Sequence, residues 1–344
     1  MKILIVSDAT RFALTDVYNG YIHALEQLKI PYESHPYHHF RGICSDATCF
    51  HRIHSIALTK TKEFTHMMFI GGLNVPDYIF ESLYHIKSIV VATEDPHSFD
   101  PMKHRLNHID YYFSNERSIG NCKKFKNTYY CPTAGDNQEC GRIPRDFIDE
   151  KYKSDILFLG AIYPNRRKLL ESIIPLVEEK GLSFKVCGHV QYMPKSSPLW
   201  KYVFDARTIP HIETVKYYNG AKIVLNMLRD TTWNPRTKSG KNPYNRGKFS
   251  AESLNPRAYE VPLCQSFMLL EDTRDEAREV FTDKDVGFFS DEQTLNDQLK
   301  YFLYGDGKDK LDNMILSAYN TVSSKHTYLH RMLYIRDILD QTAT

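Results

Sequence analysis

The sequence lacks long apolar runs and paired-cysteine motifs, and each absence excludes a class of protein. No stretch approaches the roughly 18 apolar residues that a membrane-spanning helix needs. The run at residues 2–6 is too short for a secretory leader, and no small-residue cleavage site follows it. The seven cysteines are odd in number and form no C-x-x-C pair, which indicates reduced thiols rather than disulfides or a zinc site. We therefore expect a cytoplasmic protein.

An excess of charge of one sign is also lacking. The formal net charge is only +2, so overall electrostatics favours neither a nucleic-acid partner nor a membrane surface. With 42% apolar and 25% charged residues, the composition is that of an ordinary globular protein. A length of 344 residues is more than one core usually needs, and it predicts two domains.

Two further motifs are missing. The first predicted strand is followed by the residues SDATRF (7–12) and not by G-x-G-x-x-G, which disfavours a nicotinamide-dependent Rossmann enzyme. No repeat with a period of 20–50 residues is present, which excludes a solenoid or propeller.

What the sequence does contain is two series of alternating strands and helices. Strands are expected at 2–6, 66–70, 88–92, 110–114 and 128–131, and again at 156–159, 183–187, 222–227 and 266–270. Helices are expected at 16–29, 76–85, 165–180, 211–219, from 256, at 291–303 and from 310 onward. Such alternation predicts an α/β fold of two facing Rossmann-like domains with a cleft between them.

We expect four segments. Residues 1–135 form an acceptor domain, 136–154 a linker rich in Pro, Gly, Asp and Arg, and 155–325 a donor domain. Residues 326–344 form a C-terminal helix that packs back on the first domain. The fold alone does not choose between an enzyme and a protein that closes on a small ligand.

The most informative stretch is residues 252–260. Asn255 followed by Pro256 predicts a helix start, which places Glu252 in the preceding loop and Glu260 in the second turn. A helix start beside Arg257 suits a diphosphate, and carboxylates suit sugar or ribose hydroxyls. The spacing alone is equally compatible with an ordinary capped helix whose acids face solvent.

Several pieces of the chain, in order, resemble CgeB-like glycosyltransferases, which are named for a spore maturation protein. They are the residues FLG (158–160) with NRR (165–167), YYNGAK (217–222) with LN (225–226), 253–270 with EDT (271–273), and KHTY (325–328) with Arg331. The N-terminal half matches mainly at TEDP (93–96). The resemblance covers most of residues 155–340, and such sequences occur in spore-forming bacteria and in bacteriophages.

The resemblance implies a retaining glycosyltransferase of the GT-B type that uses a nucleotide-sugar, with UDP as the expected nucleotide. It implies that Glu252 holds the donor sugar's hydroxyls and Glu260 the ribose. The other expected donor-binding residues are Arg166, Asn226, Lys248, Asn255 and Arg257. Many relatives carry an Arg and a Lys where this chain has Ala161 and Arg166.

No metal or other cofactor is expected. The chain has no convincing D-x-D site, and fixed cations can stabilise a departing diphosphate in place of Mg²⁺. His35, His38 and His39 lie close together, but their spacing matches no standard metal site.

The expected acceptor-side catalytic residues are Glu94 and Asp95, which join Glu252 as catalytic candidates. They follow the strand at 88–92 and would position or deprotonate the acceptor hydroxyl. A plain turn at the strand end is the alternative, because Asp-Pro commonly opens turns.

Residues 229–257 carry seven basic side chains against two acidic ones, interleaved with aromatic residues. This composition suits a DNA backbone and an extruded base, or equally a loop that covers the donor diphosphate. The expected acceptor-binding residues are His38, His39, Trp233, Arg236, Lys238 and Lys241. The acceptor is expected to be a hydroxymethylated pyrimidine in phage DNA, with a surface or spore protein or glycan as the alternative. A non-catalytic nucleotide-sugar-binding protein is the third possibility, and the oligomeric state is left open.

Overall fold

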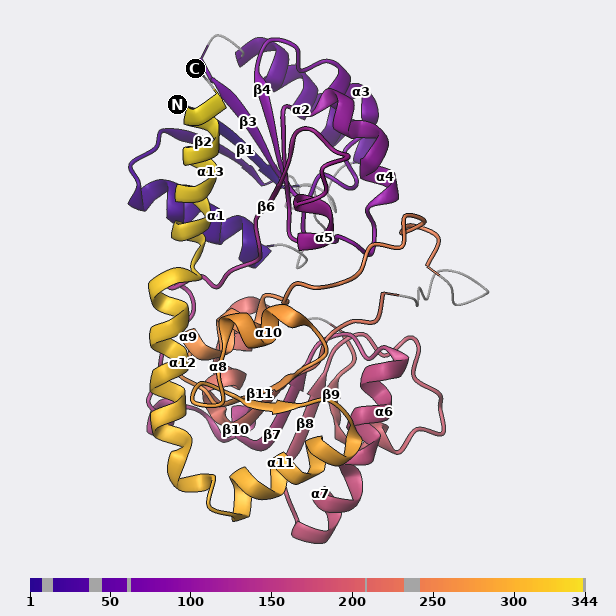
Figure 1. The fold of residues 1–344 in the computed structure, drawn as a ribbon, viewed down its shortest axis with the longest axis vertical. Coiled ribbons are helices and arrows are strands. Elements are labelled where there is room, and N and C mark those ends of the chain that lie inside the picture. The colour runs from indigo at the N-terminus through magenta and orange to yellow at the C-terminus, as the bar shows by residue number, and fades with distance from the viewer. Residues whose placement is uncertain (8–14, 37–44, 61–62, 208, 232–241, 343–344) are drawn as a thin grey trace. The chain divides into compact units, whose positions relative to one another are not determined.

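The computed structural model describes residues 1–7, 15–36, 45–60, 63–207, 209–231 and 242–342. Their contacts divide the chain into two compact units, which are described one at a time. The first unit comprises Met1–Thr133, Thr231–Ser253 and Tyr328–Thr344, and the second comprises Ala134–Asp230 and Leu254–Thr327. Each unit contains a six-stranded sheet whose paired strands are parallel, which confirms the predicted α/β fold with two Rossmann-like sheets (Figure 1).

The sheet of the first unit has the order β2-β1-β3-β4-β5-β6. Its strands are β1 (Ile3–Ser7), β2 (Tyr32–Pro36), β3 (His66–Ile70), β4 (Lys87–Val91), β5 (Tyr111–Ser114) and β6 (Thr128–Tyr130). Its helices are α1 (Thr15–Gln27), α2 (Asp46–Lys60), α3 (Asp77–Glu81), α4 (Asp100–Lys103), the 3₁₀ helix η2 (His104–His108), α5 (Arg117–Gly120) and α13 (Tyr328–Thr342). All five residues of β1 are buried, as its unbroken apolar run predicts for a central parallel strand.

The sheet of the second unit has the order β9-β8-β7-β10-β11-β12. Its strands are β7 (Ser154–Leu159), β8 (Phe184–Cys187), β9 (Val203–Asp205), β10 (Ala221–Asn226), β11 (Met268–Glu271) and β12 (Gly287–Phe289). Its α-helices are α6 (Pro164–Ser172), α7 (Ile174–Lys180), α8 (His211–Gly220), α9 (Arg257–Leu263), α10 (Asp275–Val280), α11 (Glu292–Tyr304) and α12 (Leu311–Lys325). Its 3₁₀ helices are η3 (Arg145–Phe147), η4 (Glu150–Tyr152), η5 (Pro198–Tyr202) and η6 (Lys308–Lys310).

Alternate residues of β7 bury into two separate apolar clusters, one on each face of the second sheet. Leu157 and Leu159 belong to one cluster, whereas Ile156 and Phe158 belong to the other. This follows from the two-residue period of a strand, and it makes β7 a fixed central element of the unit.

The helix predicted at 165–180 is two helices, α6 and α7, which meet at Ile173. Pro175 lies in the first turn of α7. Proline has no N–H for a bond to the preceding turn, and its ring clashes with that turn's carbonyl, so a continuous helix would be costly here.

The segment Thr231–Ser253 lies within the range expected for the donor domain, but its contacts group it with the first unit. The ring of Phe249 packs edge-on against Phe99 at 5.3 Å between centroids. Arg246 N–H donates to the Asp100 carboxylate at 2.6 Å, and the Asn242 side chain donates to the His97 carbonyl at 3.1 Å. An aromatic anchor and these hydrogen bonds fix the described part of the segment, 242–253, to the first unit.

A buried carboxylate secures the end of this segment. Glu116 accepts hydrogen bonds from the backbone N–H groups of Glu252 (3.1 Å) and Ser253 (3.3 Å) and from the Ser253 hydroxyl (3.3 Å). It also accepts from the N–H of Ser118, so one side chain caps α5 and holds the end of the segment.

The C-terminal helix α13 lies along α1 in the first unit (Figure 1). The Arg331 guanidinium donates to the carbonyl of Pro132 at 2.8 Å and to that of Thr133 at 3.0 Å. Within the part of the chain that the structure describes, no helix has both the length and the apolar character needed to cross a membrane.

Gly20 of α1 lies against the Tyr328 ring at the start of α13, and it provides a test of this packing. A Cβ at Gly20 would overlap the Tyr328 ring, with the ring's Cγ only 2.6 Å away. Gly20→Ala would ordinarily stabilise a helix by about 1 kcal/mol. Here we expect it to destabilise the protein by about 1–3 kcal/mol because of overpacking.

Urea unfolding of Gly20→Ala beside Gln27→Ala, an exposed position on the same helix, measures the effect. A gain of stability at Gly20 would show that α13 does not pack here in this way.

Candidate functional site

The order of the strands in the second unit reverses between β7 and β10. The chain runs outward from β7 through β8 to β9, and outward on the other side from β10 through β11 to β12. In open α/β sheets, ligands bind outside the carboxyl ends of the strands at such a reversal. The residues that follow β7 and β10 are therefore the expected site, and several sequence-predicted residues lie there.

Arg166 lies in the first turn of α6, just beyond β7, and is 7% exposed. Its Nη1 donates to the Ala161 carbonyl at 3.0 Å, and its Nε donates to the Leu228 carbonyl at 3.3 Å. These bonds join the loop after β7 to the loop after β10. Burial and the neighbouring Arg257 guanidinium lower the pKa of Arg166 to about 9.

Arg257, in the first turn of α9, reaches the same edge of the sheet. Its Nη1 donates to the Asn226 side-chain oxygen at 3.2 Å, and the Asn255 side chain donates to the same atom at 2.9 Å. The Nε of Arg257 is buried and has no hydrogen-bond partner among the described residues. The structure thus brings together four predicted donor-binding residues: Arg166, Asn226, Asn255 and Arg257.

Gly160, directly after β7, makes room for these guanidinium groups. Its φ is +152°, and a Cβ there would lie 2.6 Å from Arg257 Nη2 and 3.5 Å from Arg166 Nη1. A side chain at this position would displace Arg257, so glycine is needed both for the backbone conformation and for the close approach.

Arg229 is a third guanidinium at this edge, and it was not among the predicted site residues. Its guanidinium carbon lies 5.0 Å from the centre of the Tyr163 ring, and that of Arg166 lies 5.3 Å from the same ring. The available signal was its position, because Arg229 opens the basic segment three residues after β10.

Glu271, at the end of β11, is a buried acid whose charge acts on Arg166. It accepts the Leu228 N–H at 2.6 Å. Burial raises the pKa of Glu271, while the Leu228 N–H and the charge of Arg166 act to lower it. Cations concentrated around glycine and backbone carbonyls can bind an anion such as a diphosphate.

Glu260 also lies in α9, in its first turn rather than the predicted second, because the helix begins at Arg257. Pro256 is the N-cap residue, and the Asn255 side chain before it accepts the Ala258 N–H at 3.3 Å. Glu260 is buried and accepts the Tyr218 hydroxyl at 3.2 Å.

His211 contacts the Glu260 carboxylate, which no pattern in the sequence predicted. Its Nε2 lies 3.5 Å from Glu260 Oε1, and its Nδ1 lies 2.7 Å from Glu139 Oε2. Burial alone would lower the pKa of His211, but Cys140, Glu139 and Glu260 together raise it well above its ordinary value.

Glu252 and Lys248 belong to the first unit. The boundary between the units falls between Ser253 and Leu254, so Glu252 and Glu260 belong to different units. The carboxylate of Glu252 accepts the Ser250 hydroxyl. Lys248 is exposed, with a φ of +52°. Their predicted roles in donor binding remain predictions.

Asp95 and Glu94 follow β4 in the first unit, as expected. Glu94 is exposed, whereas Asp95 is buried and accepts the hydroxyls of Ser114 (2.7 Å) and Tyr112 (2.9 Å). Burial raises the pKa of Asp95 to about 7, although both hydroxyls act to lower it. The predicted acceptor-binding residues lie outside the described residues: His38, His39, Trp233, Arg236, Lys238 and Lys241.

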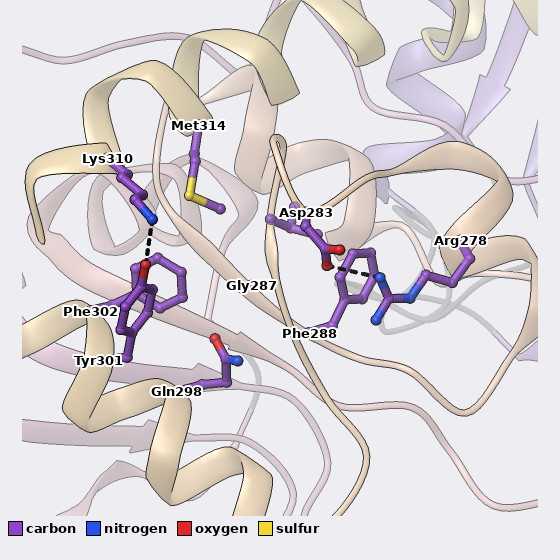
Figure 2. Close-up of a pocket in the computed structure, with 10 residues that line it drawn as sticks. Arg278, Asp283, Gly287, Phe288, Gln298, Tyr301, Phe302, Lys310 and Met314 are labelled. Carbon is purple, nitrogen blue, oxygen red and sulfur yellow. Dashed lines mark hydrogen bonds and ion pairs between the residues drawn. The ribbon is translucent and has the colours of Figure 1, made fainter. Parts of the chain in front are cut away.

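A separate pocket of about 300 Å³ lies between β12, α11 and the start of α12 (Figure 2). Its two cations are already paired: Lys310 with the Tyr301 hydroxyl at 2.6 Å, and Arg278 with Asp283 at 2.8 Å. None of the predicted site residues lines this pocket.

Comparison with known proteins gives a family match over the second half of the chain. The profile of the glycosyl transferase-like family matches residues 166–337, which is half of the chain. Spore protein CgeB from Bacillus subtilis (strain 168) is 24% identical over 211 residues. That alignment spans 60% of this chain and 59% of the spore protein.

Solved structures match over nearly the whole chain. A sucrose-phosphate synthase from Thermosynechococcus elongatus matches with a TM-score of 0.61 at 10% identity, covering 99% of both chains. Anabaena HepE in complex with UDP and glucose matches at 0.63 and 11%, covering 99% of this chain and 100% of that one. UDP-GlcNAc 2-epimerase from Neisseria meningitidis, bound to UDP-GlcNAc, matches at 0.54 and 11%, with coverages of 99% and 100%. These similarities show the GT-B fold.

The raised pKa of Asp95 predicts a pH dependence of stability. An acid whose pKa is higher in the folded than in the unfolded state stabilises the fold below the unfolded value, near 4. That contribution is lost as the pH rises through the folded value of about 7. We expect Asp95→Asn to gain stability relative to the wild type between about pH 4 and 8, by up to about 4 kcal/mol.

Urea unfolding curves of the two proteins across that pH range provide the measurement. If the free energies of unfolding of the two proteins change with pH in the same way, the pKa of Asp95 is not raised in the folded state.

Proposed function

The chain belongs to the glycosyl transferase-like family, and we propose that it transfers a sugar from a UDP-sugar to a hydroxyl acceptor with retention of configuration. The observation that carries the proposal is the group of three arginines at the strand reversal of the second unit. UDP or a UDP-sugar is bound in two of the matching structures, HepE and the epimerase, which supports this class of donor.

The arginines suit a departing diphosphate. Arg166 and Arg257 each lie within 6 Å of the Phe158 ring, at 5.9 and 5.5 Å from its centre, and each acts on the other as a like charge. A diphosphate between them would relieve the repulsion and accept bidentate hydrogen bonds. Its negative charge grows as the bond to the sugar breaks, so fixed cations lower the barrier. On this account no metal ion is required.

The remaining roles follow the family resemblance. Glu260 binds ribose hydroxyls, Glu252 binds hydroxyls of the donor sugar, and Glu94 or Asp95 acts on the acceptor hydroxyl. An epimerase has the same fold. If this chain were instead a sugar-nucleotide isomerase or a protein that only binds the nucleotide-sugar, the three arginines could bind the diphosphate in the same way.

The decisive assay is release of UDP from a panel of UDP-sugars. We expect turnover with one donor, and Arg166→Met to lower kcat by about 10²–10³ through loss of a fixed cation. Lys168→Met is the matched control, since Lys168 is an exposed cation on the same helix. Its activity should stay within about twofold of the wild type.

Binding of UDP-sugars without release, for every acceptor tried, would favour the binding protein. Interconversion of the sugar would favour the isomerase.

For the acceptor, we propose a hydroxymethylated pyrimidine in DNA, with a surface protein or glycan as the rival. The supporting feature is the basic segment 229–257. In its described part, Arg246 and Lys248 are exposed on the first unit, beside the partly exposed ring of Tyr244. Exposed cations beside an aromatic ring suit a phosphate backbone and a stacked base.

Replacing Lys238, Lys241 and Arg246 together by Ala should weaken binding to a hydroxymethylated duplex. The slope of log K against log salt should fall by about 0.9 for each phosphate that the variant no longer neutralises. Binding is measured by fluorescence anisotropy as the salt concentration is raised.

The matched control is the Ala triple variant at Lys123, Lys124 and Lys126, which removes the same charge from exposed positions elsewhere on the first unit. Equal affinities and slopes for the two triple variants would sink the DNA proposal and leave the protein or glycan acceptor.

A further inference from the structure

His211 begins α8 and lies between two carboxylates in the interior of the second unit. Its side chain is only 14% exposed, against 27% for Glu139 and 9% for Glu260. Glu139 belongs to the loop that follows β6, and Glu260 belongs to α9. One imidazole therefore connects three segments that are far apart in the sequence.

The charges around His211 favour its imidazolium form. Nδ1 lies 2.7 Å from a Glu139 oxygen and Nε2 lies 3.5 Å from a Glu260 oxygen, and only the protonated ring carries an N–H on both nitrogens. The other titratable groups of the second unit in this cluster are two thiols, a phenol and a carboxyl: Cys140 beside the ring, Cys264 just after α9, Tyr218 on α8 itself and Asp136 near Glu139. None of these four is a cation that could replace His211.

The geometry fixes both oxygens of Glu260. Oε1 faces His211 Nε2 at 3.5 Å, and Oε2 accepts the Tyr218 hydroxyl at 3.2 Å. A neighbouring positive charge favours the ionised form of a buried carboxylate, and an ionised carboxylate binds hydroxyls more strongly than a neutral one.

We propose that His211 is a positioning residue for nucleotide recognition: held by Glu139, it keeps Glu260 charged and oriented to accept the ribose hydroxyls of the donor. This rests on the proposed function, because it takes Glu260 as the ribose ligand. Beyond Glu260 itself, the Glu139–His211 pair would then determine how strongly the protein prefers a ribose to a sugar that lacks the 2′ and 3′ hydroxyls.

The competing explanation is that the three residues only hold α8, α9 and the loop together. The two explanations predict different losses. A structural ion pair affects stability and all ligands alike, whereas a positioning residue affects hydroxyl recognition alone.

The test compares affinities for UDP and 2′,3′-dideoxy-UDP by calorimetry. We expect the protein to bind UDP at least about tenfold more tightly than 2′,3′-dideoxy-UDP, as hydrogen bonds to a charged group imply. His211→Gln keeps one donor but removes the charge, and it should bring this ratio near 1 while the affinity for inorganic pyrophosphate is unchanged. Glu260→Gln should do the same.

Glu213→Gln, an acid on the same helix α8 that receives the Tyr152 hydroxyl, is the matched control and should keep the wild-type ratio. In the transfer assay, His211→Gln should raise KM for the UDP-sugar with little change in kcat, as loss of uniform binding predicts. If His211→Gln does not fold, Glu139→Gln tests the same chain of interactions and should lower the ratio part of the way.

The outcomes separate the two proposals. If the wild type binds neither UDP nor any UDP-sugar, the proposed function fails. Suppose that the wild type prefers UDP to 2′,3′-dideoxy-UDP and that Glu260→Gln does not. If His211→Gln and Glu139→Gln then both keep the wild-type affinity ratio, the positioning role is wrong and the proposed function stands. A full ratio in Glu260→Gln would also overturn the positioning role, because Glu260 would not be the ribose ligand.

Discussion

The crowding of Arg166, Arg229 and Arg257 at the end of β7 is the constraint on which the rest of the site depends. Like charges brought together and partly withdrawn from water raise the free energy of the empty site, and the lowered pKa of Arg166 expresses that cost. Backbone carbonyls and the Asn226 side chain offset part of it by accepting hydrogen bonds. The glycine at 160 leaves the space. A site built in this way favours a multiply charged anion over a neutral ligand.

The attachment of residues 242–253 to the first unit divides the donor-binding residues. Phe249 and the buried Glu116 hold that segment, and Glu252 with it, whereas the arginines and Glu260 are complete within the second unit. The residues for which we propose contacts to the diphosphate and the ribose thus all belong to the second unit, whereas the residue proposed to bind the donor sugar belongs to the first.

The sequence predicted those features that local patterns encode. Alternating apolar runs located β1, β3, β7 and β10, and the order of short motifs pointed to Arg166 and Glu260. Strands β2, β9 and β12 were missed: β9 and β12 have three residues each, as does the predicted β6, and β2 has the mostly polar sequence YESHP, so none of the three gives a clear apolar pattern. His211 was missed because its partner Glu139 is 72 residues away, and no local pattern encodes such a contact. The grouping of Thr231–Ser253 with the first unit depends on Phe249 and Glu116, which likewise act over long sequence separations.

Helix α9 links the two charged clusters of the second unit. Arg257 and Glu260 are three residues apart, so their side chains leave neighbouring positions of one face, about 5–6 Å apart at Cβ. Opposite charges at this spacing tend to pair and so to neutralise each other. Here Asn226 holds Arg257, while His211 and Tyr218 hold Glu260. Each group therefore has its own partners within the second unit. A seven-residue helix thereby carries both residues for which we propose binding to the diphosphate and to the ribose.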